Sequence, residues 1–366
     1  MAYATINKPS EHFDTQLHTG NNNNGRTFTG LNFKPDWIWG KVRDSGNYNH
    51  LSVDSSRGGT KFLAMNTTAA EDTASHGQIT SWNSDGSTWS DGTNGTYPRL
   101  YYNDGSGSAL GGSTYVFWQW RSNGGTTSSN TDGSITSTVQ ANTTAGFSIV
   151  TYTGTGANGT IGHGLGKTPE WIMTKRRDST GEWMVYQKSF SEDGSGEFNL
   201  MNLNDTDATQ EFGAWNFMQS TSPTSSVFYI DGQPEMNASG GTFVAYCFAP
   251  IKGYSKFGSY TGNGSTDGTF VYTGFKPAWL MIKRTSDTGN WLMYDVKRNT
   301  YNVMDKYLLA DNSQGEVSTD VFDFTSNGFK IRYAGGIVNT SGSSHIYMAF
   351  AESPFVSSDG VPTTAR

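Results

Sequence analysis

The chain repeats one module three times, and this repetition restricts its fold more than any other feature. The stretch from Lys34 to Gly46 reads KPDWIWGKVRDSG, and close variants begin at Lys167 and Lys276. Each copy starts with a Thr-Gly turn, continues through a Pro-x-Trp strand and ends on an aromatic strand. Self-similarity of this kind means that one structural unit occurs three times, so any fold assigned to one copy applies to all.

The aromatic strands that end the copies align without gaps, as TYVFWQW, TFVAYCF and HIYMAF. Alternate residues of a strand point to opposite sides of a sheet. One side is large and apolar in all three copies and is predicted to face a core, and the other side is mixed and is expected to be covered only in part. The apolar side comprises Val116, Trp118, Trp120, Val244, Tyr246, Phe248, Ile346, Met348 and Phe350. The mixed side comprises Tyr115, Phe117, Gln119, Phe243, Ala245, Cys247, His345, Tyr347 and Ala349.

The pattern of short strands and frequent turns predicts an all-β protein with minimal helix. Units of roughly 100 residues with turn signals every 8 to 12 residues are typical of β-sandwiches. We therefore expect three tandem antiparallel β-sandwich modules, of a jelly-roll or lectin-like kind. The alternative is one propeller-like assembly around a pseudo-threefold axis, but propeller blades need only about 40 to 50 residues each.

The predicted boundaries place repeat one at residues 1–121, repeat two at 134–252 and repeat three at 253–366. Residues 122–133, rich in Gly, Ser and Thr, are expected to form a flexible linker. Only a few residues separate repeats two and three, so these two modules are expected to pack rigidly against each other.

Composition excludes several classes of protein. The formal net charge of −7 and the lack of a basic run argue against a nucleic-acid partner. No apolar stretch approaches the roughly 20 residues that cross a bilayer, so membrane insertion is not expected. The first residues, MAYATINKPSEHF, do not resemble a signal peptide, which indicates synthesis in a cytoplasm. Cys247 is the only cysteine and cannot form an internal disulfide.

The sequence contains no recognisable catalytic motif. Nucleophile elbows, zinc-binding helices, P-loops and dinucleotide fingerprints are absent. Two carboxylate pairs could serve a glycosidase, Asp36 with Asp44 and Glu170 with Asp178, but the third repeat has Ala278 in place of the first carboxylate, and a role in turns is the simpler interpretation. The oxygen-rich run 202–207 could hold calcium, although a self-bonded loop is the simpler reading. We therefore predict no catalytic residues, no cofactor and no metal.

One stretch of repeat one is rich in aromatic residues beside Asn, Asp and Gly, a combination that suits sugar recognition. A flat ring stacks on the apolar face of a sugar while amides and carboxylates bind its hydroxyls. The predicted glycan or partner surface consists of Trp82, Trp89, Tyr97, Tyr101 and Tyr102. The alternative is that these rings pack beneath a long loop.

Several long phrases resemble a repeated module of virion proteins from marine bacteriophages, cyanophages among them. They include TINKPSEHF, FKPDWIWGK, SITSTVQANTTAGFSIVTYTG, GHGLGKTPEWIMTKRR, FVYTGFKPAWLMIKR and IYMAFAESPF, and they cover almost the whole chain. The resemblance implies a structural protein on the virion surface, of the tail-fibre or host-adsorption kind. It carries over no catalytic residue.

Three functions follow from this resemblance and from the residues. The first is a tail-fibre-like adhesin that binds host cell-surface polysaccharide. The second is a capsid or tail decoration protein with a purely structural role, and the third is a polysaccharide depolymerase. In each case the expected location is the virion and the expected partners are other virion proteins. A homo-oligomer is expected, with a trimer favoured because virion appendages sit on symmetry axes.

Overall fold

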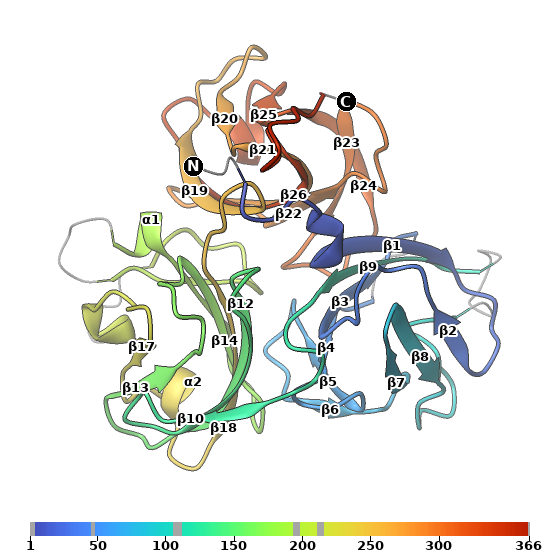
Figure 1. Ribbon diagram of the computed structural model, residues 1–366, viewed down its shortest axis with the longest axis vertical. Helices are drawn as coiled ribbons and strands as arrows, with labels where there is room; N and C mark the ends of the chain where they lie inside the picture. Colours follow the sequence, from blue (N-terminus) through green and yellow to red (C-terminus); the bar gives the residue numbers. More distant parts are fainter. Residues whose placement is uncertain (1–3, 45–47, 105–111, 193–197, 211–215, 365–366) are drawn as a thin grey trace.

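The computed structural model describes residues 4–44, 48–104, 112–192, 198–210 and 216–364. Its strands form three groups around a common centre, one from each repeat (Figure 1). The pairs of named strands are antiparallel, and one isolated bridge, Ile135 with Ile161, is parallel. The described α-helices have four residues each: α1 (Lys188–Ser191), α2 (Pro234–Asn237) and α3 (Gly336–Asn339). The predicted all-β class with minimal helix is confirmed.

The strands follow the same order in each repeat. Repeat one holds β1 (Phe13–Thr19), β2 (Arg26–Phe28), β3 (Trp37–Val42), β4 (Leu51–Asp54), β5 (Lys61–Ala64), β6 (Asp72–Thr73), β7 (Gln78–Asn83), β8 (Gly86–Ser90) and β9 (Thr114–Trp120), after the short 3₁₀ turn η1 (Pro9–Glu11). Repeat two and the segment before it hold β10 (Ser128–Asn130), β11 (Ser137–Asn142), β12 (Phe147–Thr153), β13 (Gly159–Gly162), β14 (Trp171–Arg176), β15 (Trp183–Gln187), β16 (Met201–Asn202), η2 (Phe217–Ser220), β17 (Val227–Ile230) and β18 (Thr242–Phe248). Repeat three holds β19 (Ser255–Thr261), β20 (Phe270–Tyr272), β21 (Phe275–Arg284), β22 (Leu292–Asp295), β23 (Met304–Leu309), β24 (Val317–Thr325), β25 (Gly328–Ile331) and β26 (Ser344–Pro354).

Each repeat builds an inner sheet in which the last strand of the repeat lies between the first strand and the Trp-bearing strand. The orders β1-β9-β3-β4, β12-β18-β14-β15 and β19-β26-β21-β22 are equivalent. Register agrees as well, because Trp37 pairs with Trp120, Trp171 with Phe248 and Trp279 with Phe350. The sequence repeat is therefore also a repeat of strand order and register.

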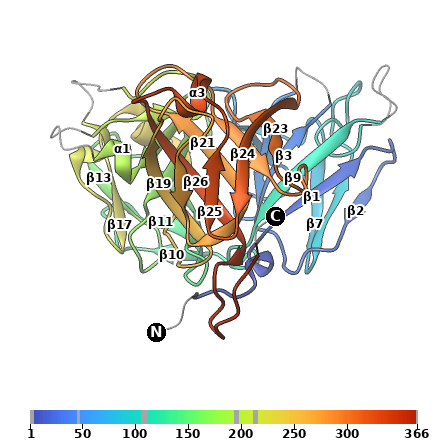
Figure 2. The ribbon, with the colours of Figure 1, turned by 90° about the horizontal axis from the view of Figure 1, so that it is seen from above.

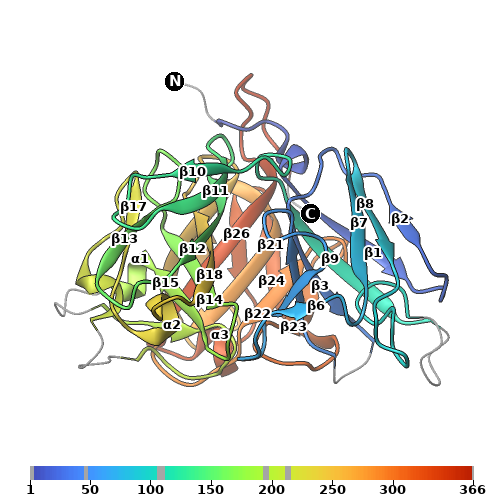
Figure 3. The same cartoon turned by 90° about the horizontal axis from the view of Figure 1, so that it is seen from below.

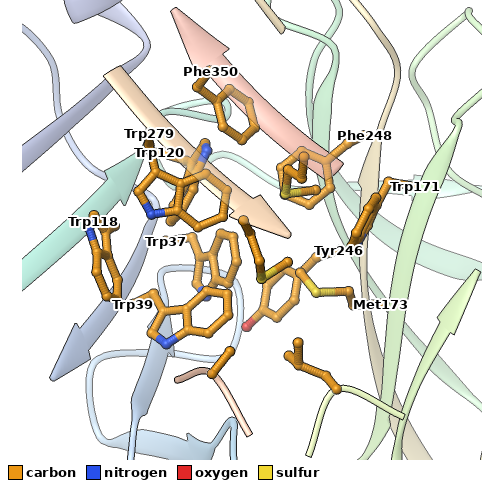
Figure 4. Close-up of a cluster of buried hydrophobic side chains, with 14 of the residues drawn as sticks. Trp37, Trp39, Trp118, Trp120, Trp171, Met173, Tyr246, Phe248, Trp279 and Phe350 are labelled. Atoms are coloured by element: carbon orange, nitrogen blue, oxygen red, sulfur yellow. The ribbon is translucent and has the colours of Figure 1, made fainter. Parts of the chain in front are cut away.

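The inner faces of the three sheets meet in one central core. Trp118, Tyr246 and Met348, which occupy equivalent positions, belong to a single cluster of buried side chains drawn from all three repeats. Figure 4 shows part of this cluster, including Trp118 and Tyr246. Trp279 of repeat three lies 5.8 Å from Trp120 of repeat one, centroid to centroid. The repeats are thus not separate modules with separate inner cores. They surround one shared core. An assembly of the repeats around a pseudo-threefold axis was the alternative that the length of each repeat had argued against.

The mixed side of the last strand of each repeat is also buried, which corrects the expectation of partial cover. Phe117, Phe243 and Tyr347 are no more than 2% exposed. Each belongs to a separate outer cluster beneath its own repeat's outer strands. In repeat one these outer strands form the three-stranded sheet β2-β8-β7, and in repeat two the pair β13-β17. Each repeat is therefore sandwich-like, with its inner sheet between the central core and an outer core.

Gly86 and Gly328 follow Asp85 and Asn327 at the turns that lead into β8 and β25, and close packing between strands requires a glycine at both positions. A Cβ atom on Gly86 would lie 1.9 Å from the backbone oxygen of Phe28, and one on Gly328 would lie 2.1 Å from that of Val271. A side chain cannot occupy such a space. The Asp-Gly and Asn-Gly turns of repeats one and three therefore place a bare backbone against the neighbouring outer strand.

The segment between repeats one and two is held against both of them. Its residues 128–130 form β10, and the amides of Ser122 and Gly124 donate to Asp36 Oδ2 at 2.7 and 2.9 Å. The amide of Gly125 donates to Gln140 Oε1 at 2.6 Å. Although rich in Gly, Ser and Thr, residues 122–133 are thus bonded in place.

The two ends of the described chain meet beside repeat three. The amide of Thr5 donates to the oxygen of Lys252 at 3.2 Å, and the amide of Ser358 donates to Asn7 Oδ1 at 2.8 Å. In Figures 2 and 3 the first residues and the stretch after β26 project from the same side of the molecule. The ring of three repeats is closed by these contacts.

Candidate functional site

The carboxylate pairs and the oxygen-rich run 202–207 are the positions that the sequence offers for catalysis or metal binding. In the described ranges, no group of three or more His, Cys, Asp or Glu side chains could hold a metal ion. Asp36 is fully buried and bonds Ser55 Oγ at 2.8 Å as well as the two linker amides. Asp178 pairs with Arg176 at 3.1 Å. Both carboxylates have structural partners in this fold. No helix among the described residues has the length and apolar character to span a bilayer.

The predicted aromatic surface of repeat one is divided between the core and the exterior. Trp89 and Tyr102 are fully buried and stack on each other at 5.5 Å in the outer core of that repeat. Trp89 also stacks on Phe117 at 5.5 Å. Neither ring can be presented to a sugar, so the prediction is wrong for these two residues. They fill the space between the inner sheet and the outer strands.

The other three residues do not form one platform. Trp82 and Tyr101 are partly buried against the same outer core, and burial raises the pKa of Tyr101 to about 12. Tyr97 is 50% exposed. The structure therefore leaves Tyr97 as the one well-exposed ring of the predicted set.

A cavity of about 420 Å³ lies where the end of repeat two meets repeat three. It lies between the start of β19, the turn after β20 and the stretch after β26, and it is lined by Pro250, Lys252, Gly253, Ser255, Lys256, Tyr272, Thr273, Gly274, Phe355 and Val356. Tyr272 is 54% exposed and offers a ring face at the rim. Binding sites commonly combine such an apolar wall with a few polar groups.

Lys256 provides a fixed cation in this cavity. Its Nζ donates to the backbone oxygen of Tyr272 at 2.6 Å and lies 5.5 Å from the centroid of that ring. Burial lowers the pKa of Lys256, and Glu170 opposes the shift. Among the described residues, no carboxylate lies within ion-pair distance of Lys256. A bound carboxylate or hydroxyl could therefore accept from this ammonium group.

Sequence reasoning missed this cavity although one signal was present. Phe270 and Tyr272 alternate with the buried Val271 on β20, so two aromatic rings point outward from one edge strand. Alternation placed the rings on one side of the strand, but it could not show that this side was the exterior.

A second groove, of about 460 Å³, lies in repeat one between β1 and β2. It is lined by residues 15–18 of β1, residues 26–29 and Lys297. It runs beside the free edge of β1, the strand equivalent to β19.

Buried charge networks join neighbouring repeats across the central core. Tyr246 Oη of repeat two donates to Asp54 Oδ2 of repeat one at 2.8 Å, and Arg57 binds the same carboxylate at 2.5 Å. Arg57 also pairs with Glu71 at 2.9 Å. The side chains of Asp54 and Arg57 have no exposed surface, so each charge depends on the other.

The same network recurs between repeats one and three but not between repeats two and three. Trp118 Nε1 donates to Asp295 at 2.9 Å, and Arg298 binds that carboxylate at 2.5 Å. We call the contact between two neighbouring repeats a seam. At the seam between repeats two and three, the equivalent positions hold uncharged side chains, namely Gln187, Phe190 and Met348. Two of the contacts between repeats thus contain a buried ion pair, and the third is formed by uncharged side chains at the same positions.

Three equivalent lysines are buried where the inner sheets adjoin. Lys41, Lys175 and Lys283 are at most 2% exposed and pair in register with Val116, Val244 and Ile346 respectively. Lys175 donates to the oxygen of Thr68 in repeat one at 3.2 Å, and Lys283 to that of Thr206 in repeat two at 2.9 Å. Two of these lysines therefore bind a loop of the preceding repeat.

Replacing Lys41 by methionine is expected to change the pH dependence of stability. Burial lowers the pKa of Lys41 to about 7 from its ordinary value of 10.5. Between these two values the unfolded chain holds a proton that the folded chain has lost, so stability rises with pH across this window. Lys41→Met removes this rise, and the difference in unfolding free energy between the two proteins should change on the order of 3 kcal/mol from pH 6 to pH 10.

Urea unfolding at pH steps across this range measures that difference. Lys8→Met is the control, since the Lys8 side chain is 75% exposed and this replacement should leave the slope unchanged. Parallel stability curves for wild type and Lys41→Met would contradict the prediction.

Comparison with known proteins identifies one family. Its model, described as Domain of unknown function (DUF7483), matches residues 8–354. No curated protein and no solved structure matches the chain. The matched range runs through all three repeats, so the unit that defines the family is the ring of three and not the single repeat. The chain belongs to the DUF7483 family.

Proposed function

We propose that the protein is a structural protein on the surface of a bacteriophage particle, of the tail-fibre or host-adsorption kind, and that it binds host cell-surface glycan. The resemblance of its long repeated phrases to virion proteins supports the location. The observation that carries the binding role is the cavity of about 420 Å³ beside the exposed ring of Tyr272. The finer assignment of each repeat as a jelly-roll or lectin-like sandwich belongs to the same proposal.

The cavity favours sugars that carry a carboxylate. Tyr272 offers a flat face for the apolar side of a pyranose ring. Lys256 supplies a cation that is already oriented by the backbone oxygen of Tyr272. A uronic acid or similar residue would use both groups, because a charged acceptor binds an ammonium more strongly than a neutral hydroxyl does.

Tyr272→Ala is expected to weaken adsorption to host cells or their purified polysaccharide at least tenfold. The variant removes the stacking face without disturbing a buried contact. Tyr97→Ala is the matched control, since Tyr97 is 50% exposed and Tyr272 is 54% exposed. Surface plasmon resonance on immobilised polysaccharide gives both affinities, and thermal unfolding shows whether each variant is folded.

The outcomes separate the possibilities. Loss of binding in Tyr97→Ala alone would move the site to the loop of repeat one. Wild-type protein that binds no host polysaccharide would overturn the glycan role and leave capsid or tail decoration, for which copy number per particle is the measure. New reducing ends after incubation with polysaccharide would instead identify a depolymerase.

The oligomeric state belongs to this proposal too. A single chain already arranges three repeats around one centre, so it can sit on a threefold particle axis as one copy or around the axis as three. The trimer favoured by sequence reasoning is the second case. Light scattering on the purified protein decides between them.

A further inference from the structure

The first strand of each inner sheet has a different neighbour in repeat two from those in repeats one and three. β1 and β19 are the terminal strands of their sheets. β12, their equivalent, is covered along its outer edge by β11, with Thr138 opposite Thr151 and Gln140 opposite Ile149. β11 lies at the start of repeat two, ahead of β12, and the other repeats have no counterpart of it in their described sheets.

The groove of about 460 Å³ beside β1 corresponds to the space that β11 fills in repeat two. β11 contacts repeat one there, since Gln140 Nε2 donates to Ser56 Oγ at 2.8 Å. Ser56 follows Asp54 by two residues, and its equivalent in repeat three is Lys297, which follows Asp295 by two. Lys297 lines the groove beside β1. The same seam is therefore filled by a strand in one case and open in the other.

The edge of β1 has an unused backbone amide that faces this groove. Gly20 donates to the oxygen of Ser113 and Arg121 to that of His12, so the even-numbered residues of β1 bond to β9. The backbone amides and oxygens of the odd-numbered residues of β1 therefore point away from β9, toward the free edge of the sheet. Thr15 is satisfied by Asp14 Oδ1 at 2.8 Å, whereas among the described residues no acceptor is found for the amide of Leu17. Leu17 is also 38% exposed.

We propose that the groove beside β1 binds an extended segment of another polypeptide, which adds to the inner sheet of repeat one as an antiparallel strand. The internal precedent is β11, which does the same for β12 within the chain. Strand addition of this kind gains affinity from main-chain hydrogen bonds and specificity from alternate side chains. The proposal does not depend on glycan binding.

The charge of the groove specifies one feature of the incoming strand. Lys297 is half exposed, and Arg26 carries a second positive charge within the groove. Asp14 lies 3.6 Å from Lys297 and balances one of the two. A carboxylate at the position that Gln140 holds in β11 would face Lys297. The partner strand is therefore acidic at that position and otherwise rich in small hydroxyl and β-branched residues.

The test uses a synthetic peptide with the sequence of residues 134–143 and the change Gln140→Glu, SITSTVEANT, labelled for fluorescence anisotropy and titrated with the full-length protein. One peptide should bind per chain. Leu17→Pro removes the outward amide without breaking a bond to β9 and should weaken binding at least tenfold. Ser259→Pro makes the equivalent change in β19 and should leave the affinity unchanged.

A second measurement needs no protein variant. The same peptide N-methylated at the residues corresponding to Thr138 and Gln140 cannot donate to a neighbouring strand, and it should not bind. Lys297→Glu should weaken binding of the acidic peptide and strengthen binding of a peptide that has lysine at the same position. Equal binding of the methylated and unmethylated peptides, or no binding to wild type, would overturn the proposal.

Two other results would also overturn it. Binding unchanged by Leu17→Pro would mean that the peptide displaces β11 from β12 or binds elsewhere. A wild-type dimer by light scattering that Leu17→Pro converts to a monomer would assign the edge of β1 to a second copy of this chain.

Discussion

Replacing Arg57 by phenylalanine is expected to lower the free energy of unfolding by about 3–5 kcal/mol. The reason is the carboxylate of Asp54, which is fully buried and would lose the guanidinium that binds it at 2.5 Å. Tyr246 Oη would remain as a neutral donor to that carboxylate. An uncompensated buried charge is among the most costly defects that a single substitution can create.

The chain also indicates how the loss can be reversed. At the seam of repeats two and three, Gln187, Phe190 and Met348 occupy the positions of Asp54, Arg57 and Tyr246. The triple variant Asp54→Gln, Arg57→Phe, Tyr246→Met copies that uncharged arrangement into the first seam. It should recover most of the lost stability and come within about 1–2 kcal/mol of the wild type, since buried ion pairs exchange for packed apolar groups at little cost.

Urea unfolding of the wild type, the single variant and the triple variant measures both effects. Arg177→Met is the control for a less buried ion pair to Glu71, because Arg177 is 20% exposed, and it should cost no more than about 1 kcal/mol. A triple variant that is less stable than Arg57→Phe would show that the seams are not interchangeable.

Replacing Trp279 by alanine is expected to cost about 3–5 kcal/mol and to weaken repeats one and three together. Trp279 belongs to repeat three, yet its ring lies 6.4 Å from Phe13, 6.4 Å from Trp118 and 5.8 Å from Trp120, all of repeat one. Its indole nitrogen has no hydrogen-bond partner among the described residues, so the loss is one of packing. Figure 4 shows the ring of Trp279 near those of Trp118 and Trp120.

Native-state hydrogen exchange distinguishes shared from local destabilisation. Trp279→Ala should reduce protection in β9 as well as in β26. Phe329→Ala is the comparison, since Phe329 is fully buried in the outer core of repeat three. Its closest rings, Phe322 and Tyr347, belong to the same repeat. Unchanged protection of β9 in Trp279→Ala would contradict a shared central core.

The sequence predicted strand phase correctly because phase depends on local alternation. Trp118, Tyr246 and Met348 were assigned to a core face and lie in one core. The partial cover expected for Gln119 and His345 was wrong, since both are fully buried. Gln119 Nε2 donates to Gln16 Oε1, and the ring nitrogens of His345 lie within hydrogen-bond distance of backbone oxygens. The sequence does not show whether a polar residue on the mixed side of a strand will be exposed or will be buried beside a hydrogen-bond partner.

The sharing of the central core was harder to predict because it depends on contacts between distant segments. One signal was available in the sequence. Lys41, Lys175 and Lys283 lie on the same side of their strands as the core-facing tryptophans. A lysine on that side needs polar partners, and for Lys175 and Lys283 these include backbone oxygens of a neighbouring repeat. The candidate site failed for a related reason. Aromatic residues in a long loop, such as Trp89 and Tyr102, look the same in sequence whether they face a ligand or a core.

The position of the last strand within each inner sheet has a consequence for synthesis of the chain. β9, β18 and β26 each lie between two earlier strands, so no repeat can complete its inner sheet until its final residues have left the ribosome. The central cluster includes Phe350 of β26, so it closes only after the last strand of repeat three has been made. Until then the nascent chain carries tryptophan-rich faces without their partners. Such a chain is a natural client for chaperones, and premature termination would release an aggregation-prone fragment instead of a smaller stable protein.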